Sequence, residues 1–124
     1  MDGSWRIELY ETEGGAYPFD TWHRKLPPHK RGVVEEAIRN QLVPRGIGVC
    51  GNDWGRALGV GLYELRIRRR DVLLRVFFAP IDERTLLLLG GLDKGRQTKR
   101  QGAEIRACRA RLADWHRRNM RFTT

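Results

Sequence analysis

The sequence is poor in cysteine and histidine, and this excludes several kinds of site. Its two cysteines, Cys50 and Cys108, are far apart, form no Cys-x-x-Cys pair and have no histidine beside them. Such usage is typical of reduced thiols in a cytoplasmic protein. We therefore expect neither a disulfide framework nor a cysteine-based metal site.

Long apolar runs are also missing. The longest, Leu86–Leu92 (LLLLGGL), falls well short of the roughly 18 residues that a membrane helix needs. Residues 1–15 are mixed and acidic, unlike a signal peptide. These features predict a cytoplasmic protein without membrane association. A length of 124 residues fits one domain, expected to span 1–124, with residues 117–124 as a flexible basic tail.

The net charge of +9 is unevenly distributed along the chain. Residues 1–62 hold eight basic and eight acidic side chains, whereas residues 63–124 hold sixteen basic and seven acidic ones. A one-sided positive field attracts polyanions, so nucleic acid is a candidate partner. Basic surfaces also occur on membrane-associated and on merely soluble proteins, and charge alone does not separate these classes.

Hydrophobic spacing predicts an α+β domain. Alternating side chains predict strands, and apolar residues at helical spacing predict helices. The expected order is strand, two helices, three strands and helix, at residues 5–11, 19–26, 28–42, 63–68, 72–79, 86–92 and 101–118. We expect a small twisted, mainly antiparallel sheet with an N-terminal helical hairpin and a C-terminal helix. The last strand lacks alternation and should be central, covered on both faces.

The segment Pro44–Gly61 contains six glycines and two arginines, Arg45 and Arg56. It lacks the Gly-Lys-Ser/Thr ending of a phosphate-binding P-loop. We therefore expect an irregular connection, whose two arginines remain candidates for contact with a nucleic-acid backbone.

Arginines also lie inside two neighbouring predicted strands. Arg66 and Arg68 alternate with apolar residues in one strand, and Arg75 stands within the strongly apolar next one. An arginine in an apolar strand is costly unless it is paired or faces a wet groove, which favours a functional role. A purely structural interpretation stays open, in which Arg66 pairs with Glu64 or Glu104 on a solvated face.

Five motifs, taken in order and spacing, resemble the RelE/HigB-like toxins of bacterial toxin–antitoxin pairs, in particular their phage-derived branch. They are LYELR at 62–66, RVFF at 75–78, the leucines at 86–89, DKG with the basic segment at 93–100, and EI at 104–105. With a looser N-terminal match the resemblance covers nearly the whole chain. It implies a RelE/ParE-like fold, with two N-terminal helices packed on a small antiparallel sheet.

The resemblance also implies an activity and partners. Many members enter the ribosomal decoding site and cut messenger RNA there without a metal or other cofactor. The partners would be the ribosome, its mRNA and a cognate antitoxin, commonly a helix-turn-helix protein. Cutting RNA without metal requires cations that hold the charge developing on the phosphodiester. Arginine suits this role because its planar guanidinium stays charged and grips two phosphate oxygens.

The resemblance assigns candidate site residues. Arg66 and Arg75 match basic strand positions and would clamp the phosphate; Lys94 would contact phosphate or transfer a proton. The residues expected to line the approach of RNA are Arg68, Arg96 and Lys99. Arginines of the last helix are expected to form a solvated face, with ribosomal RNA or an acidic antitoxin segment as the alternative contact: Arg106, Arg109, Arg111, Arg117 and Arg118.

No general base is evident from the sequence. Relatives often place tyrosine, histidine or glutamate near the end of the domain, where this chain has Gln97, Thr98 and Gln101. Its histidines are expected at the surface: His23, His29 and His116. Asp93, beside Lys94, remains a candidate, although neighbouring cations favour its charged form.

Two other functions fit the same features. ParE-like toxins share the architecture but poison DNA gyrase; the retained Arg66, Arg75 and Lys94 argue against this activity. The other alternative is a non-catalytic prophage-encoded RNA-binding protein, whose basic half would bind phosphate with steep salt dependence. A neighbouring gene for a helix-turn-helix protein would favour either toxin, and RNA cleavage would separate the two.

Overall fold

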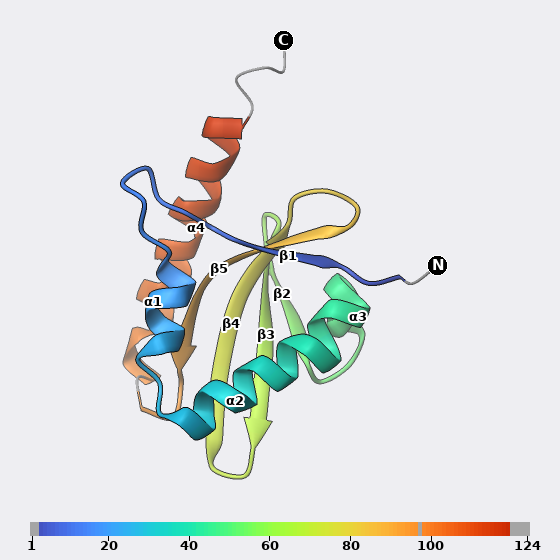
Figure 1. The fold of residues 1–124 in the computed structure, drawn as a ribbon, viewed down its shortest axis with the longest axis vertical. Coiled ribbons are helices and arrows are strands. Elements are labelled where there is room, and N and C mark those ends of the chain that lie inside the picture. Colours follow the sequence, from blue (N-terminus) through green and yellow to red (C-terminus); the bar gives the residue numbers. More distant parts are fainter. Residues whose placement is uncertain (1–2, 97, 120–124) are drawn as a thin grey trace.

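The described part of the chain folds around a five-stranded mixed sheet (Figure 1). The computed structural model describes residues 3–96 and 98–119. The strands lie in the order β1-β5-β4-β3-β2, with β1 parallel to β5 and the other pairings antiparallel. Their bounds are β1 Arg6–Leu9, β2 Gly55–Gly59, β3 Leu62–Arg69, β4 Val72–Pro80 and β5 Thr85–Asp93. The predicted α+β class with a mainly antiparallel sheet is confirmed.

β5 is the buried central strand that its sequence predicts. All nine of its residues are buried between β1 and β4 and beneath helices on both faces. Its two glycines allow this close cover. A Cβ on Gly90 would collide with Cys108 of the last helix, and one on Gly91 would collide with the ring of Trp22.

Helices pack on both faces of the sheet (Figure 1). The helices α1 Pro18–Arg24 and α2 Pro28–Ala37 cover one face, and α4 Gln101–Asn119 covers part of the other. The first core layer includes Phe19 and Val34, and the second includes Leu112. The chain between Leu9 and α1 runs along α4, and the hydroxyl of Tyr10 donates a hydrogen bond to Asp114.

The two N-terminal helices do not form the expected hairpin. α1 contacts β5, whereas α2 diverges from it and contacts β3. Consecutive prolines explain the separation, because Pro28 can begin a helix but interrupts one that is already running. The chain then continues through further helical segments: a π-helical turn at Ile38–Leu42, α3 at Val43–Arg45 and a 3₁₀ segment at Gly46–Gly51.

Part of the segment predicted to be irregular is in fact an edge strand, β2. It pairs antiparallel with β3 through a two-residue turn at Val60 and Gly61, whose φ angles of 53° and 78° are both positive. A turn of this kind matches the twist of the flanking strands. β2 cannot be predicted from the sequence because Arg56, Ala57 and Gly59 do not favour strands intrinsically.

The C-terminal helix ends one residue beyond the predicted range of 101–118. α4 continues through Asn119, so the first three residues of the expected tail at 117–124 are helical, and residues 120–124 lie outside the described residues. No helix within residues 3–96 and 98–119 combines the length and the apolar character of a membrane span.

Candidate functional site

Four arginines surround one glutamate on the face of the sheet that also carries α4. Leu65, Ile67, Leu74 and Val76 point into the core beneath α1 and α2, so the residues that alternate with them point to the opposite face. The group that results is Arg56 on β2, Glu64, Arg66 and Arg68 on β3, and Arg75 on β4. We call these five residues the arginine cluster.

Strand register brings the members of the arginine cluster together. Arg66 lies directly opposite Arg75 across β3 and β4, and Glu64 lies opposite Arg56 across β3 and β2. Like charges directly opposite each other destabilise a sheet. Glu64 counters this repulsion from the centre of the group, with Oε1 3.8 Å from Arg75 Nε and Oε2 3.9 Å from Arg66 Nε.

The buried part of the cluster has unused hydrogen-bonding capacity. Arg75 and Glu64 are each only 1% exposed. Within the described chain, three buried side-chain atoms of the cluster have no hydrogen-bond partner: Glu64 Oε1, Arg66 Nε and Arg75 Nε. Arg75 donates from one terminal nitrogen to the carbonyl of Leu74 at 3.1 Å. Buried polar atoms are normally paired, so these atoms leave hydrogen-bonding capacity unused next to Arg66, whose side chain is 26% exposed.

The electrostatics of the cluster favour an anion. Four guanidinium groups and one carboxylate carry a net charge of +3. Burial is the largest cause that lowers the pKa of Arg75; Glu64 opposes that shift, and the charges of Arg66, Arg68 and Arg56 add to it. A bound phosphate would supply the charge that the single carboxylate leaves uncompensated.

The other predicted site residues lie outside this group. The backbone N–H of Lys94 donates to the carbonyl of Leu73 at 2.8 Å, and Leu73 is paired with Arg68, so Lys94 sits across β4 from Arg68 at the same end of the sheet. Arg96 is exposed and lines a groove beside α1. Lys99 is exposed in a short 3₁₀ turn ahead of α4. Arg66, Arg68 and Arg75 are therefore the predicted residues that the fold gathers.

Asp93 is engaged elsewhere. It pairs in register with Leu74, which places it on the face of α1 and α2, opposite the arginine cluster. Its Oδ2 lies 2.5 Å from Lys30 Nζ on α2. Gln97 falls outside the described residues. The histidines also lie apart: His23 contacts Glu35 at 3.1 Å, and His29 and His116 are exposed.

Glu64 is the functional candidate that sequence reasoning missed. The sequence alone makes it a candidate surface partner of Arg66, yet it is buried and faces both Arg66 and Arg75. Glu104, the other proposed partner, instead contacts Arg111 at 3.2 Å. A strand alignment that sets Arg66 opposite Arg75 would have revealed Glu64 as the carboxylate between them.

Three of the five predicted α4 arginines, Arg109, Arg111 and Arg118, are partly buried and support the fold, whereas Arg106 and Arg117 are exposed on a solvated face as expected. Arg109 donates to the carbonyls of Leu58 and Gly59, and Arg111 donates to that of Leu89. Arg117 and Arg118 contact Asp114.

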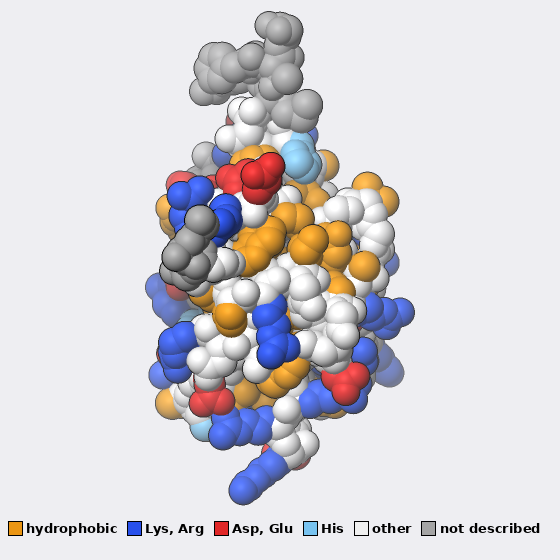
Figure 2. All heavy atoms as spheres, turned by 90° about the vertical axis from the view of Figure 1, so that its right-hand side faces the viewer, with side chains coloured by type: hydrophobic (Ala, Val, Ile, Leu, Met, Phe, Trp, Pro, Cys, Tyr) orange, Lys and Arg blue, Asp and Glu red, His pale blue; other side chains and the backbone are white. Residues whose placement is uncertain are grey.

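Figure 2 shows Lys and Arg side chains spread around a central hydrophobic area on one face of the molecule, rather than in one patch.

The chemistry of the arginine cluster is that of an anion site. Within the described residues, no group of three or more His, Cys, Asp or Glu side chains could hold a metal ion. Neither a scan against descriptions of known protein families nor a search of curated proteins finds a match. The functional conclusion therefore depends on the geometry of the cluster.

Proposed function

We propose that the chain is the toxin of a toxin–antitoxin pair and acts as a metal-independent, ribosome-dependent mRNA endoribonuclease. The observation that carries the proposal is the arginine cluster, in which the Nε atoms of buried Arg75 and half-buried Arg66 have no hydrogen-bond partner in the described chain and lie beside exposed Arg56 and Arg68. Guanidinium groups held in a sheet need no reorganisation when charge develops on a phosphate. The motifs shared with RelE/HigB-like toxins point to the same chemistry.

The reaction we propose is attack of the ribose 2′-oxygen on the adjacent phosphorus. A bond forms between the 2′-oxygen and phosphorus, the bond from phosphorus to the 5′-oxygen breaks, and the products end in a 2′,3′-cyclic phosphate and a 5′-hydroxyl. Arg66 and Arg75 would hold the non-bridging oxygens. Glu64, whose Oε1 lacks a hydrogen-bond partner in the described chain, is only 1% exposed and would accept the proton of the 2′-hydroxyl through one intervening water. The leaving oxygen takes a proton from Lys94 or from water.

The partners belong to the same proposal. Arg68 is exposed at the edge of the site, and Arg96 and Lys99 are exposed outside it; all three would contact mRNA or ribosomal RNA. The antitoxin would be a helix-turn-helix protein that blocks this activity. Cytoplasmic location follows from a ribosomal target.

The test is RNA 5′-end mapping in bacterial cells after brief induction. Arg66→Gln removes one guanidinium from the half-buried edge of the cluster, and Arg75→Gln removes the buried one. Arg24→Gln is the matched control, because Arg24 is an exposed α1 residue paired with Asp20. New ends inside translated codons should appear with the native chain and the control, and both cluster variants should lose them.

Other results would redirect the proposal. Growth arrest with intact transcripts would contradict the nuclease and favour a gyrase poison. The absence of both arrest and new ends from soluble, expressed protein would favour a non-catalytic binding protein. Loss of new ends in Arg24→Gln as well would mean that overall positive charge, rather than the cluster, supports the activity.

A further inference from the structure

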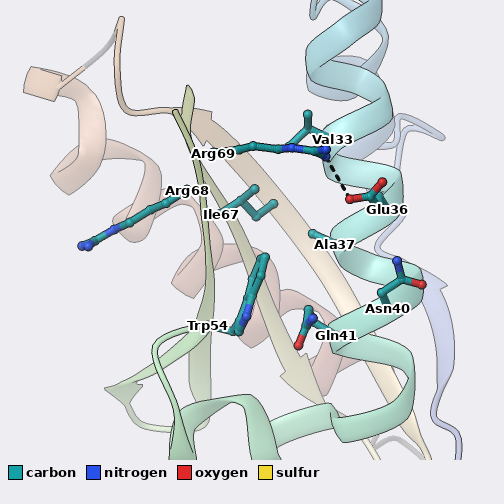
Figure 3. Close-up of a pocket in the computed structure, with 9 residues that line it drawn as sticks. All are labelled: Val33, Glu36, Ala37, Asn40, Gln41, Trp54, Ile67, Arg68 and Arg69. Carbon is teal, nitrogen blue, oxygen red and sulfur yellow. Dashed lines mark hydrogen bonds and ion pairs between the residues drawn. The ribbon is translucent and has the colours of Figure 1, made fainter. Parts of the chain in front are cut away.

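A small cavity lies close to the arginine cluster but opens on the other face of the sheet. Its walls are α2 with the π-helical turn on one side, and Trp54 and the end of β3 on the other (Figure 3). Ile67 forms its floor, and the exposed ion pair of Glu36 and Arg69, 2.9 Å apart, stands at its mouth. In Figure 3 Arg68 points away from this cavity, toward the face that carries the arginine cluster.

The cavity and the arginine cluster lie on either side of a free edge of β3. β2 begins at Gly55, opposite Leu65, so residues 67–69 of β3 have no described strand beside them on that side. Trp54 stands at this opening. It lines the cavity and also a shallow pocket on the cluster side, together with Arg66 and Arg68. A strand of RNA whose phosphate lies on the cluster would therefore pass Trp54.

Trp54 is held firmly in place. Its backbone N–H donates to Asn52 Oδ1 at 2.8 Å, and its carbonyl accepts the N–H of Arg66 at 2.8 Å. Its side chain is half-buried, which leaves part of the indole open to a ligand. A fixed, partly exposed aromatic ring is a platform on which an unpaired base can stack.

The polar wall of the cavity has unused capacity as well. Gln41 faces Trp54 across the cavity, and its Oε1 is buried without a hydrogen-bond partner in the described chain. Asn40 presents a second amide at the rim. Both residues lie in the π-helical turn Ile38–Leu42, a distortion often found at functional sites. Side-chain amides offer donor and acceptor together, as the edges of nucleobases require.

We propose that this cavity binds one unpaired nucleobase of the RNA whose phosphate occupies the arginine cluster. The base stacks on Trp54 and presents its polar edge to Gln41 and Asn40. This inference rests on the proposed function for the nature of the ligand. It adds a subsite that reads base identity, which a phosphate clamp alone does not do.

The first experiment measures binding of single-stranded RNA octamers of A, C or U to the purified chain over a range of salt concentrations. Trp54→Leu keeps an apolar side chain in the core but removes the ring, and Trp54→Phe keeps a ring. We expect Trp54→Leu to weaken binding roughly 5- to 150-fold. The slope of log affinity against log salt should stay unchanged, whereas Arg68→Gln should reduce it by about 0.7. Trp54→Phe should bind nearly as the native chain does.

Trp115→Leu is the matched control, because Trp115 is a half-buried tryptophan of α4 that packs in the other core layer. Native-like binding by Trp54→Leu, or an equal loss in Trp115→Leu, would overturn the inference. So would a reduced salt slope in Trp54→Leu, because it would show that the variant had disturbed the phosphate contacts instead.

The second variant, Gln41→Leu, tests the reading of the base edge. It removes a buried acceptor without a partner, so the fold should be at least as stable. We expect it to narrow the differences in affinity among the three octamers; an unchanged ranking and spread would contradict a role in base recognition. The two proposals fail separately. A Trp54 effect without mRNA cleavage overturns only the nuclease, and cleavage without a Trp54 effect overturns only the base site.

Discussion

Replacement of Glu64 should reveal how much stability the arginine cluster costs the fold. Glu64→Leu removes the central carboxylate and leaves Arg75, 1% exposed, directly opposite Arg66 without a countercharge. Breaking a buried ion pair by removing one partner typically costs about 3–5 kcal/mol. For a domain of this size that corresponds to a fall in Tm of roughly 10–20 °C. Urea unfolding followed by circular dichroism gives the free energy of unfolding directly.

The double variant Glu64→Leu/Arg75→Met tests what happens when both buried charges are removed together. Both buried charges are then replaced by apolar side chains of similar size, a change that is often neutral or stabilising in other proteins. Arg66 is 26% exposed and can remain hydrated on its own. We therefore expect the double variant to recover most of the native stability while losing all RNA cleavage.

A matched control separates burial from simple loss of charge. Glu36→Leu removes an exposed carboxylate paired with Arg69 at 2.9 Å, and should cost no more than about 1 kcal/mol. If Glu64→Leu were as mild as this control, the buried charges would impose no cost on the fold. If the double variant were less stable than Glu64→Leu, the cluster would be a stabilising network. Either result would refute its proposed functional origin.

Two further predictions concern titratable groups. The pKa of Asp114 is lowered, first by the hydroxyl of Tyr10 and then by Arg118. Its contribution to stability is therefore present above about pH 4 and is lost as the pH falls further. Asp114→Asn should lower Tm at pH 7 and match the native chain near pH 2, whereas an equal difference in Tm at both pH values would contradict the ionic origin. Burial raises the pKa of Cys108 to about 12, and burial followed by Glu64 raises that of Cys50. At pH 8 a thiol reagent should therefore modify the half-buried Cys50 slowly and Cys108 only after unfolding, whereas rapid modification of Cys108 in the folded protein would refute the packing around α4.

Much of the fold could be predicted because its elements have strong periodicity. The unbroken apolar run at β5 predicted a strand buried on both faces, and the alternation around Arg66 predicted β3. β2 was not predicted, since it exists through its pairing with β3 and has little preference of its own. The divergence of α1 from α2 depends on which strands each helix packs against, and that information is not local in sequence.

Part of the site could be predicted because it too shows in the local sequence pattern. Arg66, Arg68 and Arg75 are conspicuous because charge interrupts an apolar pattern. Glu64 becomes meaningful only when register places it between Arg56 and Phe77, close to Arg75. Trp54 and Gln41 lie in different segments and face each other only across the cavity between β3 and α2. The roles of Lys94, Arg96 and Lys99 stay predictions.

The central claim is that the arginine cluster promotes attack of a 2′-hydroxyl on its own phosphodiester. The most direct measurement uses ribosomes programmed with a short mRNA and the purified protein, and analyses the ends of the products. We predict 2′,3′-cyclic phosphate and 5′-hydroxyl ends, no cleavage when the nucleotide before the cut carries a 2′-deoxyribose, and a loss of about 10²- to 10⁴-fold in rate for Glu64→Gln. Products with 5′-phosphate ends, cleavage of the 2′-deoxy substrate, or a full rate with Glu64→Gln would contradict the account.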